Sequence, residues 1–117
     1  MTDEQATAYL RENGYPEHLI RGGRAGLIAR WAKFVDEVEH GYRFGLEDYR
    51  NDLDVRGIIA LLGMDAEVQS LDRRFEAKLI NRDKRVWESA PNDPFWDYGY
   101  PNSTGTQFLE DIRNEGL

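Results

Sequence analysis

The stretch GRAGLIARWAKFVDEVEHGY, residues 23–42, decides the fold class of this chain of 117 residues. Its large apolar side chains recur at steps of three and four residues, which is the repeat of one face of an α-helix. The sequence therefore predicts a helix of about five turns, and Gly41 stands where such a helix commonly ends. The stripe consists of Leu27, Trp31, Phe34, Val38 and Tyr42, with Ile28 and Val35 beside it.

The segment 46–62 carries the same repeat on two sides of a further helix. Glu47 and Asp48 lie in its first turn, where the helix dipole favours acidic side chains, and Gly63 follows its end. Because a helix that is apolar on opposite faces is buried on both, we expect it to be the central helix of the fold, with Gly57 and Ala60 allowing a neighbour to approach closely. One face holds Leu46, Tyr49, Leu53, Gly57 and Ala60, and the other holds Val55, Ile58, Ile59 and Leu62.

Shorter helices are predicted around these two, each with a start signal and a stop signal in the sequence. Pro16 also opens a single helical turn ahead of residue 23. The shorter helices run from Thr2 to Asn13, from a cap at Asp65 to a point between Asn81 and Lys84, and from the capping-box pair Thr104 and Gln107 to Gly116.

These elements predict an all-α fold. No segment alternates apolar and polar residues for long, so no sheet is expected. The short connections at 41–45 and 63–64 predict that the three middle helices pack as antiparallel neighbours. We expect a single domain over residues 1–117, a small bundle of about four to five helices. An irregular aromatic and proline-rich segment would pack across that bundle.

The charge and composition exclude several classes of function. A net charge of −7 disfavours binding to nucleic acid and to anionic membranes, and it favours a basic partner. The lack of cysteine excludes disulfides and thiolate chemistry. No apolar run reaches the roughly 20 residues of a membrane helix, and the acidic first residues do not resemble a secretory leader. We therefore expect a cytoplasmic protein whose partner is another protein or a second copy of the chain in a homodimer.

The segment APNDPFWDYGYPNSTG, residues 90–105, allows two interpretations. As a lid it would bury its rings and Trp87 against the bundle, and its prolines would reduce the entropy lost on ordering. As a platform it would bind a partner through Phe95, Trp96, Asp97, Tyr98 and Tyr100. No Arg or Lys separates the rings, which argues against nucleic acid. We favour the lid.

A buried polar core of Asp52, Arg56 and Asp72 is predicted between two helices. Asp52 and Arg56 are four residues apart and can pair on one helix. Asp72 interrupts the apolar stripe of the next helix, and because a buried charge needs a partner, an Arg56–Asp72 bridge is expected. The alternative is a metal or acid–base site of Asp52, Asp54 and Asp72, although the spacing fits neither a calcium hand nor a diiron bundle.

No catalytic motif is present, and neither His18 nor His40 has a paired ligand spacing, so no catalytic residue, metal or cofactor is assigned. The run RGGRAG, residues 21–26, precedes a helix, where Arg21 and Arg24 could hold an anion. The leading hypothesis is a non-enzymatic acidic protein-interaction module of the inhibitor, immunity or regulatory-subunit type. The alternative is a small metal- or carboxylate-dependent enzyme that uses the acids near Asp52.

Overall fold

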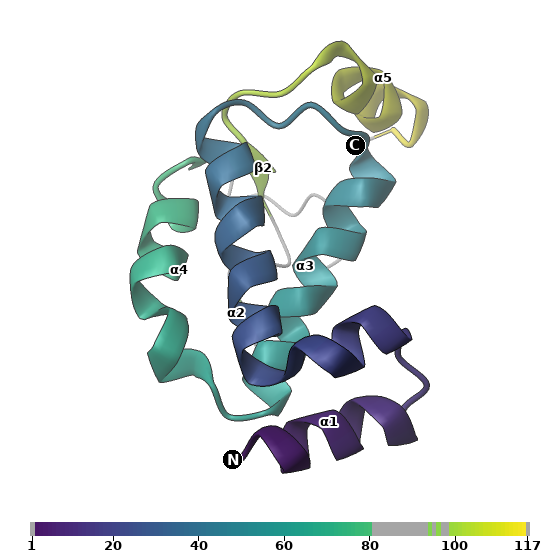
Figure 1. Cartoon of the computed structure of the whole chain (residues 1–117). Helices are drawn as coiled ribbons and strands as arrows, with labels where there is room; N and C mark the ends of the chain where they lie inside the picture. Colours follow the sequence, from purple (N-terminus) through teal and green to yellow (C-terminus); the bar gives the residue numbers. More distant parts are fainter. Residues whose placement is uncertain (1, 81–93, 95, 97–98, 117) are drawn as a thin grey trace.

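The computed structural model describes residues 2–80, 94, 96 and 99–116, and in this part of the chain the fold is all-α, as predicted. Its only sheet in these residues is one antiparallel pair of two-residue strands, β1 and β2, with Leu79 opposite Pro101. Figure 1 shows these elements: α1 (Asp3–Glu12), α2 (Glu17–Glu39), α3 (Leu46–Leu61), the 3-10 turn η1 (Asp65–Val68), α4 (Gln69–Glu76), β1 (Leu79–Ile80), β2 (Tyr100–Pro101) and α5 (Thr106–Asn114).

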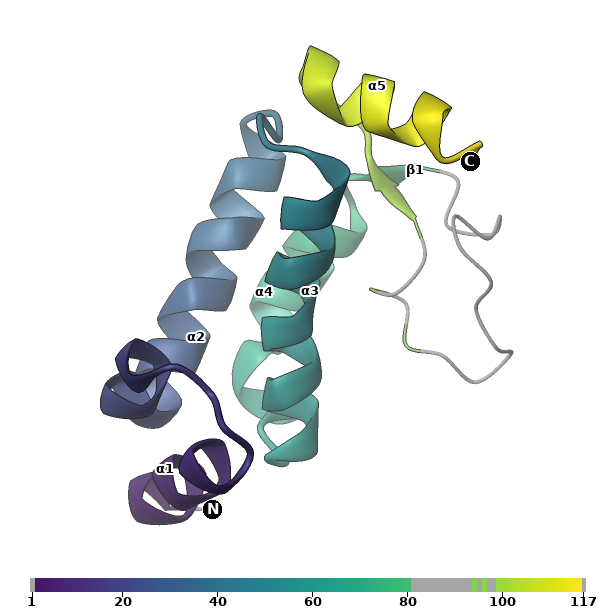
Figure 2. The same ribbon diagram turned by 90° about the vertical axis from the view of Figure 1, so that its right-hand side faces the viewer.

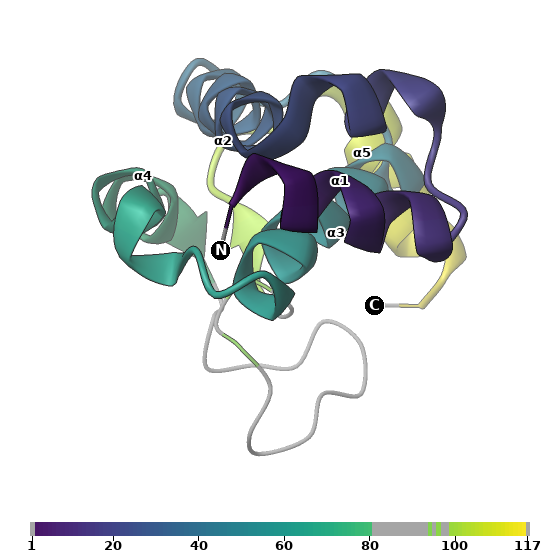
Figure 3. The same ribbon diagram turned by 60° about the horizontal axis from the view of Figure 1, so that its bottom comes forward.

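The central helix is α2, and the expectation that α3 would be central is wrong. Helix α2 packs against α1, α3 and α4, while α1 crosses one end of the bundle and α5 covers the other (Figures 1 and 2). Figure 3 shows α4 and α3 on either side of α2. Helix α2 is central because it is long, with 23 residues, and because its buried apolar stripe is broad enough to contact three neighbouring helices.

Helices α2, α3 and α4 reverse direction in turn (Figure 1), but the predicted antiparallel packing holds for α2 and α3 only. Helix α4 packs mainly against α2, and the two run in the same direction (Figure 1). Gly57 does not provide a close approach either. Within the part of the chain that the structure describes, no atom lies within 4 Å of where its Cβ would be.

The corner between α1 and α2 is set by local signals. Thr2 and Gln5 form a capping box at the start of α1, and Gly14 follows its end with a φ of 74°. Pro16 is the N-cap of α2, so the predicted single turn is joined to the long helix. The join is at Gly23, whose φ of 58° and ψ of −151° are open to glycine and very few other residues.

Two predicted helix ends differ from the structure because tertiary contacts override local signals. Helix α4 ends at Glu76, not between Asn81 and Lys84, since Leu79 and Ile80 pair with β2. The N-cap of α5 is Gly105 and not Thr104. Its amide donates to the Tyr42 carbonyl at 2.8 Å, which ties the start of α5 to the end of α2.

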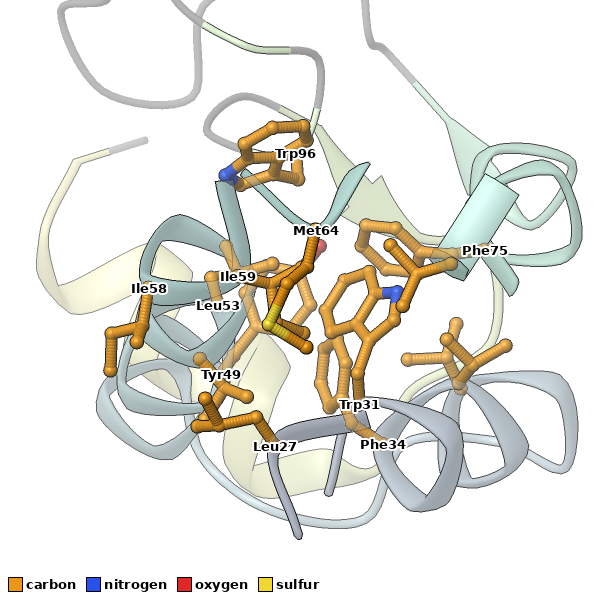
Figure 4. Close-up of a cluster of buried hydrophobic side chains, with 14 of the residues drawn as sticks. Leu27, Trp31, Phe34, Tyr49, Leu53, Ile58, Ile59, Met64, Phe75 and Trp96 are labelled. Atoms are coloured by element: carbon orange, nitrogen blue, oxygen red, sulfur yellow. The ribbon is translucent and has the colours of Figure 1, made fainter. Parts of the chain in front are cut away.

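The core is a cluster of aromatic rings at the centre of the bundle (Figure 4). Phe34 contacts four of them, with ring centroids 5.3–5.7 Å away, and Trp31 meets Phe75 edge to face at 5.1 Å. Phe108 brings α5 onto this cluster. The four rings around Phe34 are Trp31, Tyr42, Tyr49 and Phe75.

Candidate functional site

The predicted bridge between Arg56 and Asp72 is present and is part of a larger network. Arg56 is 2% exposed. Its Nε and Nη2 donate to the two carboxylate oxygens of Asp72 at 2.9 and 2.8 Å, and Nη2 also lies 2.7 Å from Asp65 Oδ1. Trp31 Nε1 donates to Asp72 Oδ1 at 3.0 Å. The side chain of Asp65 therefore binds Arg56 and does not cap the helix that follows it.

Trp96 lies over this network. Its ring is 4.1 Å from the Arg56 guanidinium carbon, and its side chain is 9% exposed (Figure 4). This burial favours the lid interpretation at Trp96. Tyr100 is half-buried and meets Phe108 edge to face at 5.9 Å, whereas Trp87, Phe95, Asp97 and Tyr98 lie outside the described residues.

Asp52 does not belong to the Arg56 network, which corrects the predicted polar core. Its Oδ2 accepts a hydrogen bond from the Tyr42 hydroxyl at 2.8 Å. Burial raises the pKa of Asp52, and the nearby charge of Asp48 raises it further, against the opposite effects of the Tyr42 hydrogen bond and of Arg30 and Lys33. The carboxyl group is thus held in one orientation in a place that disfavours its charge.

Asp52 lines a small cavity between α2 and α3, of about 190 Å³. Burial raises the pKa of Glu37, and the nearby charge of Asp52 raises it further. The positive charge of Lys33 has the opposite effect on this pKa. The spacing of the α2 residues explains their common position, since 30, 33, 34 and 37 share one helical face. The lining residues are Arg30, Lys33, Phe34, Glu37, Asp52 and Val55.

A second hollow of about 360 Å³ adjoins the first at the end of α2, and the two share Lys33 and Glu37. Phe44, in the connection to α3, lines it and is 50% exposed. We call the two hollows together the α2–α3 groove. The remaining residues of the second hollow are Asp36, His40, Gly41 and Arg43.

The outward side of α3 is a second candidate surface. Glu47, Asn51 and Asp54 follow one another at helical spacing, and Leu61, 69% exposed, lies on the same side seven residues further on. Asp48 is exposed nearby, and its Oδ2 accepts the Gly45 amide at 3.2 Å. We call these five residues, 47, 48, 51, 54 and 61, the outer face of α3. They are all the exposed residues of this helix, and none is basic.

Elsewhere, several acids are paired within the chain. Arg74 of α4 binds Asp36 at 2.6 Å and also binds Glu39, and this hydrogen bond lowers the pKa of Glu39. Arg50 binds Glu115 at 3.0 Å. These pairs hold α4 to α2 and α5 to α3. No described ion pair engages an acid of the outer face of α3, although Arg50 lines a hollow of about 480 Å³ together with Glu47 and Asn51.

The basic run at 21–26 is already supplied with acids from the same chain. The Arg24 amide donates to Asp3 Oδ1 at 3.3 Å, and the Arg24 guanidinium pairs with Glu67. The anion site hypothesised at this helix start is therefore occupied by Asp3.

The structure does not bring the hypothetical metal site together. Asp72 binds Arg56, Asp52 binds Tyr42, and Asp54 is on the exposed side of α3. Among the described residues there is no group of three or more His, Cys, Asp or Glu side chains that could hold a metal ion. None of the helices described is both long and apolar enough to cross a membrane.

Comparisons with protein-family models, with curated proteins and with solved structures found no match. The functional argument therefore depends on the geometry of this chain. Sequence reasoning missed the position of Glu37 opposite Asp52. One sequence feature could have indicated this position. Lys33 and Glu37 are four residues apart on the margin of the apolar stripe, so both side chains lie on the side of the helix next to its neighbour.

Proposed function

We propose that the protein is a non-enzymatic interaction module that binds a basic partner protein through the outer face of α3. One observation carries the proposal. The exposed positions of this helix hold the carboxylates of Glu47, Asp48 and Asp54 with the amide of Asn51, and the neighbouring Arg50 is bound by Glu115 of the same chain. A partner with Lys or Arg at matching positions would relieve their mutual repulsion.

The length of the face suits a helical or extended segment of the partner. Glu47 and Leu61 are 14 residues apart, which corresponds to about 21 Å along a helix. Leu61 would add an apolar contact at one end, and burying a leucine side chain contributes about 1.5–3 kcal/mol. Exposed ion pairs contribute only about 0–1 kcal/mol each, so the acids would act mainly on association rate and partner choice.

The test compares two double variants with equal loss of charge. Glu47→Gln with Asp54→Asn neutralises the outer face, and Glu12→Gln with Glu110→Gln removes two exposed acids elsewhere. Each protein is used to capture partners from a lysate of its source cells, and the captured protein is identified by mass spectrometry. Binding of that purified partner is then measured by calorimetry at low and high salt.

We expect the wild type and the control variant to bind alike and the outer-face variant to bind several times more weakly. The difference should shrink at high salt, because screening weakens exposed charge interactions. Equal binding by all three proteins would reject the outer face as the binding surface. A partner without a basic surface would reject the proposal itself.

A specific observation also supports the alternative of a carboxylate-dependent enzyme. Asp52 lies in a cavity with Glu37, and the pKa of each is raised, an arrangement found in acid–base sites. In such an enzyme Asp52 would transfer a proton and Tyr42 would hold its carboxyl group in place. Loss of a measured turnover in Asp52→Asn, with the fold intact, would support this alternative.

A further inference from the structure

We propose that the smaller hollow of the α2–α3 groove, which Asp52 lines, is a binding site for a small zwitterion that carries an ammonium group and a carboxylate. The proposal concerns the inner side of α3, which faces α2, and it does not use the outer face of that helix. It can therefore be tested independently of the proposed partner protein.

Opposite charges line this cavity without pairing. Arg30 and Lys33 line it together with Glu37 and Asp52. Among the ion pairs within 4 Å in the described part of the chain, none joins either cation to either acid. Charges of both signs thus face a shared space, and a ligand with both charges could bridge them.

These charges have a definite order along the cavity. Arg30, Lys33 and Glu37 follow one another on α2, and Lys33 and Glu37 are one turn apart, about 6 Å along the axis. Asp52 adds its charge from α3, close enough to Glu37 to raise the pKa of that residue. In the smaller hollow, Lys33 of the cationic pair and Glu37 of the acidic pair are therefore separated by about one helical turn along α2, and Arg30 and Lys33 are also near enough to Asp52 to lower its pKa.

The Asp52 carboxyl group is already held in place without a ligand. The hydrogen bond from Tyr42 at 2.8 Å holds the Asp52 carboxyl group, and Tyr42 itself is fully buried. A fixed group loses little entropy when it binds a ligand. An ammonium group here would lie between two carboxylates whose charges are disfavoured by burial, and it would stabilise both.

The size and the walls of the cavity indicate the class of ligand. Its volume, about 190 Å³, is below the ~300–1,000 Å³ of sites for drug-sized molecules. Phe34 and Val55 are buried and form its apolar part, so a short methylene chain fits between the charged ends. These features together match an amino-carboxylic acid with its charges about one helical turn apart.

The probe for the test is 5-aminopentanoate, whose two charges are joined by four methylene groups. Binding is followed by amide chemical shifts in NMR titrations of the full chain. N-acetyl-5-aminopentanoate lacks the cation and 5-aminopentanamide lacks the anion, so the two compounds test each end of the groove. Glu37→Gln and Arg30→Gln test the protein side, with Glu12→Gln and Arg113→Gln as exposed controls of the same charge change.

We expect saturable shifts in residues 30–37 and 52–55 with the zwitterion, and at least tenfold weaker binding of both blocked compounds. Glu37→Gln and Arg30→Gln should each weaken binding at least tenfold, while the two control variants bind as the wild type does. Equal binding of 5-aminopentanamide would show a site for cations alone and would overturn the proposal. The absence of saturable shifts at 10 mM probe, or shifts confined to other residues, would also overturn it.

Discussion

Arg56 and Asp72 face each other in two parallel hydrogen bonds, 2.9 and 2.8 Å long, although they come from helices that make few direct contacts. Among the described residues Arg56 Nη1 has no hydrogen-bond partner, so this guanidinium depends on the two acids beside it, Asp72 and the exposed Asp65. Trp31 donates to the same Asp72 carboxylate. A single carboxyl group thus connects α2, α3 and α4.

Asp72→Ala should destabilise the protein by about 3–5 kcal/mol, because it leaves a buried charge without its main partner. Adding Arg56→Met should recover part of this loss, since the double variant no longer buries an unpaired cation. Urea unfolding of the two variants and the wild type measures both effects. A loss below roughly 0.5 kcal/mol for Asp72→Ala, as at ordinary surface sites, would contradict the network.

Trp96→Ala should cost about 3–5 kcal/mol, from lost burial and from the cavity left behind. The ring also covers Arg56 at 4.1 Å, so the variant exposes this guanidinium to water. Thermal melts of the variant beside those of the wild type give the measurement. A midpoint that stays unchanged would show that Trp96 is a surface for partners and not part of the core.

Asp52→Asn should remove part of the pH dependence of stability. The pKa of Asp52 is raised in the folded protein from the ordinary value of 3.8, so the folded state binds the proton more readily than the unfolded chain. The associated stabilisation is present below 3.8 and is lost as pH rises through the folded pKa. Urea unfolding between pH 3 and pH 7 should therefore show a smaller decline in the variant. The same dependence of unfolding free energy on pH in the variant and the wild type would contradict the raised pKa of Asp52.

Two glycines of α2 should respond in opposite ways to alanine. Gly23→Ala should cost about 1–3 kcal/mol, since its φ of 58° and ψ of −151° disfavour a side chain. Gly26→Ala should stabilise by about 0.4–1 kcal/mol, because a helical alanine restricts the unfolded chain. No described atom is within 4 Å of the new Cβ at Gly26. Equal effects in chemical denaturation would mean that the break at Gly23 does not constrain the chain.

Asp111 of α5 caps α3 from a distance of 65 residues in sequence, and Gly45 leaves the space for it. Its Oδ2 accepts the Leu46 amide at 3.0 Å and would lie 2.6 Å from a Cβ on Gly45. Asp111→Ala should cost about 0.5–2 kcal/mol, as the loss of a helix cap does. Gly45→Ala should destabilise the wild type more than it destabilises Asp111→Ala. Additive losses in a double-mutant cycle would reject the contact.

Local signals in the sequence specify the helices and most of their ends. Period 3.6 is a local property, and the residues that stop a helix act within a turn or two of it. Gly14, Gly41, Gly63 and Gly116 each follow a helix with a positive φ, as their positions predicted. The Arg56–Asp72 bridge was also predictable, because a charge on a buried face requires a partner of opposite sign.

Strand pairing, the capping of α3 and the partners of Asp52 depend on contacts between segments that are distant in the sequence. Leu79 is not helical because it pairs with β2. The Leu46 amide at the start of α3 is capped by the distant Asp111, whereas Asp48 in the first turn of α3 accepts the Gly45 amide. Asp52 accepts a hydrogen bond from Tyr42 and lies near Glu37. It does not pair with Arg56, although Arg56 is four residues away on the same helix. Periodicity assigns each residue to a face of its own helix, but which neighbouring helix covers that face depends on how several apolar stripes can be buried together.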